Sequence, residues 1–204
     1  NNFILYLIGI FYNFFIPGGF GGDAYKFYLM KKNYEWDFKK LFKLLVFDRL
    51  IGLGALVCIL FFMIQNFILE LNLIYMIISL LLTLALGYYI VKYLFNNQHI
   101  YFKSLGISVI NQFLQFLTIF FVILSLGIEN NFVEIIVVFI CSSILSVFSI
   151  GGIGIREYIF LISASFINVS PELSASVGLL FTFSASFSTL PGLGYLISKP
   201  KFLK

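Results

Sequence analysis

The chain alternates long apolar stretches with short polar connections, and the stretches are long enough to form helices in a bilayer. A membrane-spanning helix needs about 20 predominantly apolar residues. Stretches of about that length predict spans at residues 44–64, 71–93, 104–126, 132–149 and 173–197. Two shorter apolar segments, 3–16 and 156–170, each adjoin a cluster of glycines and are predicted to be short or half-length helices.

The composition of the chain indicates that it lies in a lipid bilayer. Apolar residues make up 61% of the chain, charged residues 11%, and the mean hydropathy is +1.03, whereas soluble globular chains carry roughly 25% charged residues. We therefore predict an all-α, polytopic integral membrane helical bundle in which residues 1–204 form a single membrane domain. The chain begins at Asn1 directly in an apolar run, so we expect a fragment that lacks N-terminal helices.

The small number of cysteine and histidine residues excludes several classes of site. Cys58, Cys141 and His99 are the only cysteines and histidine of the chain, so no metal site or disulfide framework is expected. No motif implies a bound cofactor. The net charge of +4 would suit nucleic acid, but the basic residues gather at the ends of apolar segments. We therefore expect membrane lipids, and not nucleic acid, as partners.

The basic residues also predict an orientation. If the chain changes sides at each segment, all 13 Lys and Arg fall on one side. The opposite loops hold Glu70, Glu129, Glu134 and Glu172 and no base. Because cytoplasmic loops carry an excess of Lys and Arg, we expect these loops and the C-terminus in the cytoplasm. A composition rich in Phe, Ile, Asn, Lys and Tyr indicates an AT-rich genome, which favours the plasma (inner) membrane of a bacterium or archaeon.

Two glycine clusters resemble each other. The stretch 18–25, GGFGGDAY, aligns with the stretch 151–158, GGIGIREY. Glycine-rich backbone makes a poor helix, and unwound backbone at membrane depth is tolerated only where protein buries it or water lines it. Interrupted segments at matching places in two halves are typical of transporter sites. We predict two Gly-broken half-helix elements, with inverted repeats as one interpretation; tight turns at the cytoplasmic surface are the alternative.

The clusters and their charged neighbours form the candidate site. A helix that restarts after each cluster points backbone N–H groups and a positive dipole end at one place, which suits an anionic headgroup. Ionisable residues inside a membrane are costly and therefore functional candidates, and Arg grips phosphate bidentately. The predicted headgroup-binding residues are Gly18, Gly19, Gly21, Gly22, Asp23, Lys26, Asp48, Arg49, Gly151, Gly152, Gly154, Arg156 and Glu157. The alternative is that the bases anchor span ends and pair locally with the acids.

Span 104–126 carries polar residues at three- and four-residue steps. They are Ser104, Ser108, Asn111, Gln115 and Thr118, with Gln112 beside them. This polar stripe predicts either hydrogen bonds between helices or a hydrophilic groove along which a headgroup slides. The last span instead carries small residues, which predict close helix packing: Ser174, Ala175, Gly178, Ser184, Ala185 and Ser188.

Three motifs occur in the order and spacing of a known family. The stretches 17–26 (PGGFGGDAYK), 48–52 (DRLIG) and 151–157 (GGIGIRE) resemble the lysylphosphatidylglycerol synthase transmembrane (flippase-like) family. The resemblance implies a helical bundle that, in one branch, moves aminoacylated phosphatidylglycerol between leaflets and is fused to a soluble transferase. Other members stand alone, and some are described as acting on polyprenyl lipids. Ile150 departs from the family pattern, in which proline often precedes the second cluster.

From these features we predict a flippase or transporter that moves a phosphate-bearing lipid between leaflets. The lipid would be an anionic phospholipid, with an aminoacylated one as one interpretation, or a polyprenyl phosphate, and a transferase domain or partner protein absent from this chain is a further expected partner. The alternative is the membrane-embedded part of a lipid-modifying transferase, such as a phosphatidylglycerol lysyltransferase or a polyprenyl-phosphate glycosyltransferase. Enzymatic activity is disfavoured but left open, since only Asp23, Asp48 and Glu157 are candidate bases.

Overall fold

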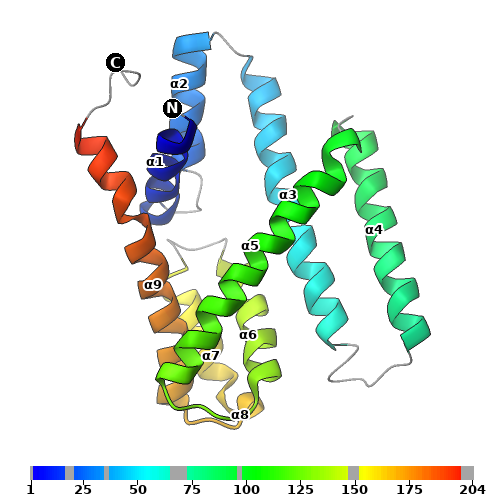
Figure 1. Cartoon of the computed structure of the whole chain (residues 1–204), viewed down its shortest axis with the longest axis vertical. Helices are drawn as coiled ribbons and strands as arrows, with labels where there is room; N and C mark the ends of the chain where they lie inside the picture. Colours follow the sequence, from blue (N-terminus) through cyan, green and yellow to red (C-terminus); the bar gives the residue numbers. More distant parts are fainter. Residues whose placement is uncertain are drawn as a thin grey trace. The chain divides into compact units, whose positions relative to one another are not determined.

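Nine α-helices and no strand make up the part of the chain that the structure, a computed structural model, describes: residues 2–16, 21–34, 37–64, 73–95, 98–146 and 152–198 (Figure 1). The helices are α1 (Asn2–Phe15), α2 (Gly21–Tyr34), α3 (Phe38–Met63), α4 (Leu73–Phe95), α5 (Gln98–Ser125), α6 (Phe132–Leu145), α7 (Ile155–Ile162), α8 (Ala164–Ile167) and α9 (Pro171–Ser198). The predicted all-α class is confirmed.

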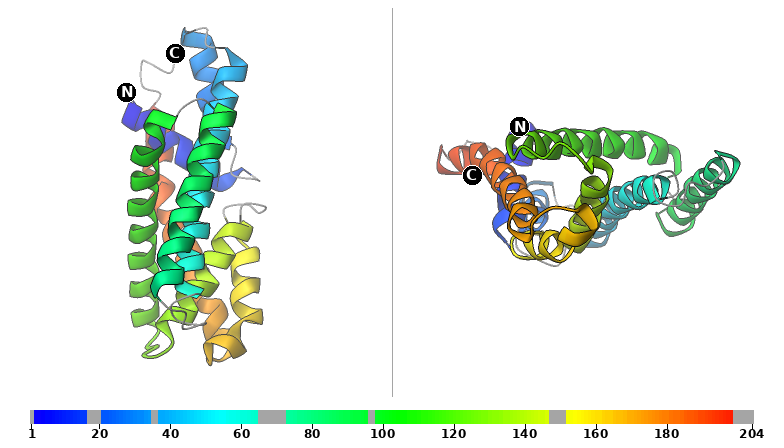
Figure 2. Two further views of the ribbon diagram at one scale, coloured as in Figure 1. Left: turned by 90° about the vertical axis from the view of Figure 1, so that its right-hand side faces the viewer. Right: turned by 90° about the horizontal axis from the view of Figure 1, so that it is seen from below.

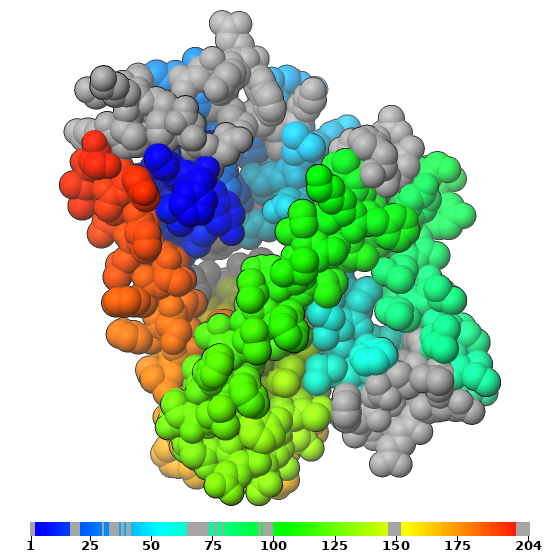
Figure 3. All heavy atoms as spheres, in the orientation of Figure 1, coloured from blue at the N-terminus to red at the C-terminus, as the bar shows by residue number. Residues whose placement is uncertain are grey.

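Three of these helices are long and apolar enough to cross a membrane. They are Phe42–Met63 of α3, Ile100–Ser125 of α5 and Pro171–Ser198 of α9, and they overlap three of the predicted spans. Bulky apolar side chains lie on the surface of α5, the bright green helix in Figure 3: Phe113 is 61% exposed and Phe121 64%. Such a surface is typical of contact with lipid. The other predicted spans stay predictions as membrane crossings.

The chain forms two compact units. Residues Asn1–Leu41 and Ser142–Lys204 form one, which we call the terminal unit, and Phe42–Cys141 forms the other, the central unit. The terminal unit therefore brings together the two ends of the sequence, and with them the two segments that carry the glycine clusters.

Helix α9 is the axis of the terminal unit. Helices α7 and α8 pack against its first half, and α1 packs against its second half, where α2 in turn covers α1 (Figure 2). Gly192 of α9 abuts the backbone carbonyl of Leu7, and Gly178 abuts the ring of Phe160. The buried Ser174 hydroxyl donates a hydrogen bond of 2.6 Å to the carbonyl of Phe160. The predicted close packing by small residues of the last span is confirmed at Ser174 and Gly178.

The start of α9 follows from local sequence. Helix α8 ends at Asn168 in the left-handed conformation, φ 57°, which Asn tolerates better than most residues. Ser170 then accepts a hydrogen bond from the N–H of Leu173 through its hydroxyl, at 3.3 Å. Pro171 occupies the first helical position, where the missing N–H removes no helical bond. These residues turn the chain sharply enough for α9 to return along α7.

The central unit is held by an aromatic and aliphatic cluster. Phe47 and Ile51 of α3, Val91 of α4 and Tyr101 of α5 form its buried core, and the rings of Phe47 and Phe95 lie 5.4 Å apart. The cluster places the first half of α3, the end of α4 and the start of α5 at one level.

Replacement of Gly192 by Ala should destabilise the terminal unit. The new Cβ would overlap the Leu7 carbonyl, so α1 and α9 must separate, at a cost of about 1–3 kcal/mol. Gly194, two residues along the same helix, has open space around its Cβ position, and Gly194→Ala should gain up to about 1 kcal/mol in helix propensity. Thermal unfolding in detergent checks both variants. Equal midpoints would contradict close packing at Gly192.

Candidate functional site

The second glycine cluster leads into α7 through two left-handed glycines. Gly152 has φ 88° and Gly154 φ 83°, values that side-chain-bearing residues rarely adopt. The N–H of Arg156 donates to the carbonyl of Gly152 at 3.1 Å, and that of Tyr158 to the carbonyl of Gly154 at 3.0 Å. The loop therefore turns straight into the helix, which is why glycine is needed at both positions.

Glu157 caps the helix that follows this loop. Its Oε2 accepts a hydrogen bond of 2.6 Å from the N–H of Gly154. The carboxylate sits in the first turn of α7, where the helix dipole favours negative charge. The sequence predicted a backbone N–H open to an anion at this place, and in the conformation described a carboxylate of the chain itself already occupies it.

Arg156 is the principal buried charge of this site. Its side chain lies in the interior, with 7% of the residue exposed. The Nη1 group donates a hydrogen bond of 2.9 Å to the Thr182 hydroxyl of α9, and the guanidinium carbon lies 4.7 Å from the ring centroid of Phe181. A Cβ on Gly152 would lie 2.8 Å from Nη1. The guanidinium is thus enclosed between the glycine loop and α9.

The charge of Arg156 is incompletely satisfied. Its Nε is buried and has no hydrogen-bond partner among the described residues. No described carboxylate lies within the 4.0 Å ion-pair distance of the guanidinium. Buried charges are normally paired, so this cation is an unusual feature that attracts an anion.

A groove opens beside Arg156 in the terminal unit. Its volume is about 410 Å³, and it lies between the end of α1, the start of α7 and the middle of α9. Phe14, Ile153, Leu179 and Phe183 form apolar walls, and the polar groups come from Gly154, Glu157, Thr182 and Ser186. Thr182 is therefore both a wall of the groove and the acceptor of the Arg156 hydrogen bond. The groove also brings Phe14, which precedes the first glycine cluster, next to the second cluster.

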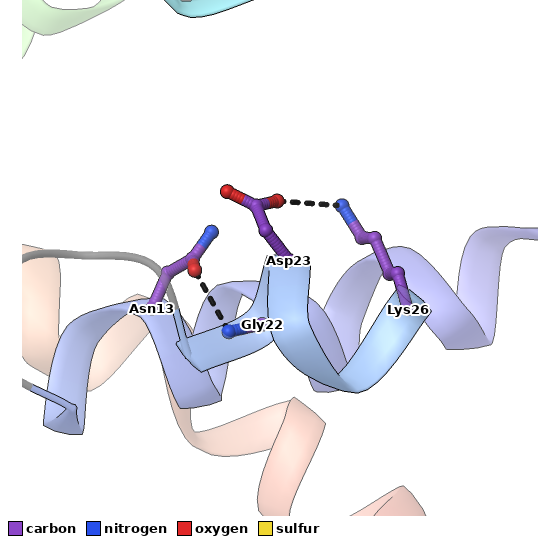
Figure 4. Close-up of polar contacts among 4 residues, drawn as sticks. All are labelled: Asn13, Gly22, Asp23 and Lys26. Atoms are coloured by element: carbon purple, nitrogen blue, oxygen red, sulfur yellow. Dashed lines mark hydrogen bonds and ion pairs between the residues drawn. The ribbon is translucent and has the colours of Figure 1, made fainter. Parts of the chain in front are cut away.

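The described glycines of the first cluster pack against α1. Gly18 and Gly19 lie outside the described residues, as does Gly151 of the second cluster. The N–H of Gly22 donates a hydrogen bond of 2.8 Å to Oδ1 of Asn13 in α1 (Figure 4). Gly22 and Gly9 are in backbone contact, because a Cβ on Gly22 would overlap the Gly9 carbonyl. Gly21 likewise packs on Ile16, 2.5 Å from where its Cβ would lie.

Asp23 and Lys26 face each other on α2. The Lys26 Nζ lies 3.9 Å from Oδ1 of Asp23 (Figure 4) and 5.7 Å from the ring centroid of Tyr6. The carbon chain of Lys26 rests on Gly9. Asp23 and Lys26 thus form an ion pair on α2, and Lys26 joins α2 to α1.

The remaining predicted site residues belong to the central unit. Asp48 is exposed and Arg49 partly buried on α3, and their predicted place in one site with Arg156 stays a prediction. The polar stripe of α5 is divided: Gln112 is 5% exposed with its Oε1 unpartnered among the described residues. The Thr118 hydroxyl donates to the Leu114 carbonyl of its own helix. Asn111 is exposed, whereas Ser108 and Gln115 are partly buried.

The sequence did not reveal three residues that complete the site. Thr182 and Phe181 of α9 receive the guanidinium, and Asn13 caps α2. Their spacing from the glycine clusters carried no signal, because the contacts join segments far apart in the chain. Within the described residues no group of three or more His, Cys, Asp or Glu is placed to hold a metal ion.

Long apolar helices define an α-helical integral membrane protein, and its candidate site is a buried arginine beside a groove. The family profile of the lysylphosphatidylglycerol synthase TM region matches residues 1–105 and 91–192. The chain therefore belongs to this family, and the resemblance seen in its motifs is confirmed. Comparison with curated proteins found no match, and comparison with solved structures found none.

Replacement of Thr182 by Val should destabilise the protein, whereas Thr182→Ser should not. The Thr182 hydroxyl donates to the Gly178 carbonyl at 2.9 Å, which leaves a lone pair for Arg156. Valine keeps the shape but leaves the guanidinium without this acceptor, at a cost of about 1–3 kcal/mol. Serine keeps the hydroxyl. Thermal unfolding in detergent measures the difference, and coincident unfolding curves for the two variants would show that the bond contributes nothing.

Proposed function

We propose that this protein moves a phosphate-bearing lipid between the leaflets of a bacterial or archaeal plasma membrane. The basic loops and the C-terminus lie in the cytoplasm in this proposal, because their Lys and Arg follow the usual cytoplasmic bias. The lipid headgroup enters the groove between α1, α7 and α9, and its chains stay in the bilayer. The lipid is an anionic phospholipid or a polyprenyl phosphate.

The observation that carries this proposal is the incompletely satisfied charge of Arg156 behind the groove wall. A buried guanidinium with one side-chain hydrogen bond and an unpartnered Nε is costly in a low-dielectric environment. An anion in the groove lowers that cost, because charges attract more strongly where water is excluded. Phosphate suits the guanidinium in charge and in hydrogen-bonding geometry.

The groove also offers a means of release. Glu157 holds the Gly154 N–H at 2.6 Å, and a phosphate that reaches this N–H displaces a carboxylate of the chain. The headgroup and Glu157 compete for one donor, so binding is reversible. The apolar walls formed by Phe14, Leu179 and Phe183 suit the glycerol or prenyl portion next to the phosphate.

Filling the groove should stop transport. Ser186 lines the groove and Ser184 does not, yet both hydroxyls donate only to carbonyls of their own helix, at 2.7 and 2.8 Å. Ser186→Leu should lower the initial rate of transport about tenfold or more, since a leucine in the groove keeps the headgroup away from the guanidinium and a hydrogen bond to a charged group contributes that much affinity. Ser184→Leu should leave the rate unchanged. The measurement is leaflet-resolved movement of fluorescent phosphatidylglycerol in liposomes that contain the full chain.

Arg156→Ala in the same liposomes should also slow transport, and a detergent unfolding curve separates loss of transport from loss of fold. Equal rates for Ser186→Leu and Ser184→Leu would remove the groove from the proposal. Conversion of the fluorescent lipid into a new chemical species would instead support the membrane-embedded part of a transferase.

A further inference from the structure

Helix α9 contains a proline beyond the groove. Pro191 lies inside the continuous helix Pro171–Ser198. Because proline has no N–H, it cannot donate the helical hydrogen bond to the carbonyl of Phe187, four residues earlier, and its ring crowds that carbonyl. Such a residue kinks a helix. Figure 1 shows the last part of α9, drawn in red, leaning away from the direction of the rest of the helix.

Two hydroxyl groups just before Pro191 weaken the helix further. The Ser188 hydroxyl donates to the Ala185 carbonyl, and the Thr189 hydroxyl donates to the Ser186 carbonyl, both at 2.7 Å. Hydroxyls that bond back to the preceding turn destabilise a helix slightly and often bend it. Residues 187–191, which we call the proline segment, therefore form a part of α9 that bends readily.

Close contacts hold α9 on both sides of the proline segment. Before it, three residues at four-residue steps along one face of α9 contact α7: Ser174, Gly178 and Thr182. After it, Gly192 packs against the backbone of Leu7 in α1, and α2 packs on α1 in turn. The proline segment thus separates two parts of the terminal unit. One part is α7 with the first part of α9, and the other is α1 and α2 with the end of α9.

The walls of the groove come from both parts. Phe14 belongs to α1. The other described residues that line the groove belong to the start of α7, to the loop before it or to α9 before the proline segment: Ile153, Gly154, Glu157, Leu179, Thr182, Phe183 and Ser186. A change in the bend of α9 would therefore move Phe14 relative to the rest of the groove.

We propose that the proline segment is a hinge and that Phe14 is the gate of the groove. A hinge needs only a few residues that absorb a change of backbone angles. When α9 bends there, α1 moves with the end of α9, because Gly192 and Leu7 are in close contact, and the ring of Phe14 moves over the groove or away from it. The Arg156–Thr182 hydrogen bond keeps the opposite walls in place. The gate rests on the proposed function of the groove, whereas the hinge does not.

The distance between α1 and α7 tests the hinge. Spin labels are attached at Phe3→Cys and Tyr158→Cys, which replace residues 69% and 61% exposed, in the full chain in liposomes, with Cys58→Ser and Cys141→Ser. We expect two populations of distances, because the bend takes two values. Pro191→Ala should lose one population, since alanine restores the N–H and the helical hydrogen bond.

Pro171→Ala is the matched control on the same helix. Pro171 occupies the first helical position, where an N–H has no helical partner, so this variant should keep both populations. A single population in the labelled chain would show that the bend is fixed and would overturn the hinge. Identical distance distributions with and without Pro191→Ala would overturn it too. Thermal unfolding in detergent establishes that each variant is folded.

The gate is tested by the reactivity of a cysteine in the groove. Ser186 lines the groove and Ser184 does not, so Ser186→Cys and Ser184→Cys are compared for their rate of modification by a charged methanethiosulfonate reagent. Phe14→Ala should raise the rate at Ser186→Cys, because no ring then covers the groove, and should leave the rate at Ser184→Cys unchanged. Equal rates at Ser186→Cys with and without Phe14→Ala would overturn the gate. Absence of lipid transport with both populations present would instead overturn the proposed function and leave the hinge in place.

Discussion

The terminal unit depends on the contact of helix backbones at glycine. Helices in a bilayer gain no hydrophobic driving force from packing on each other, because lipid is as apolar as their side chains, and close van der Waals contact must replace it. Gly22 meets the backbone of Gly9, Gly192 that of Leu7, and Gly178 that of Arg156. A methyl group in place of the hydrogen would overlap the facing backbone at Gly22 and Gly192, and would require a smaller shift at Gly178. Gly22, which belongs to a cluster predicted to break a helix, is thus also the point at which α2 meets α1.

This close packing explains how a charge can be buried. Gly178 lets the start of α7 approach α9 closely enough for Arg156 to reach Thr182, and Gly152 lets the loop fold over the guanidinium. The ring of Phe181 adds a cation–π contact at 4.7 Å, which is worth more where water is excluded. These contacts hold the cation in place but do not neutralise it. The buried guanidinium of Arg156 therefore still attracts anions beside the groove.

The helices were predictable because the apolar residues of each helix indicate that it lies in lipid. Apolar length gave α3, α5 and α9, and the glycine motif located the break before α7. The site was only half predictable. Arg156 is visible as a base beside glycines, but Thr182 is an ordinary residue of an apolar helix until folding brings it to the guanidinium. The pairing of Asn13 with Gly22 was hidden for the same reason.

Arg156 and Glu157 are adjacent, and helical geometry sends adjacent side chains to different faces. The base therefore lies inside against α9, and the acid lines the groove and caps Gly154. An anion that enters the groove approaches the Glu157 carboxylate first, and the Arg156 guanidinium attracts it from the other side of the groove wall. The conformation described is thus the one in which the chain supplies its own anion. Under the proposed function, a headgroup replaces Glu157 only if the carboxylate leaves the Gly154 N–H, so the helix cap and the proposed headgroup site would use the same donor in turn.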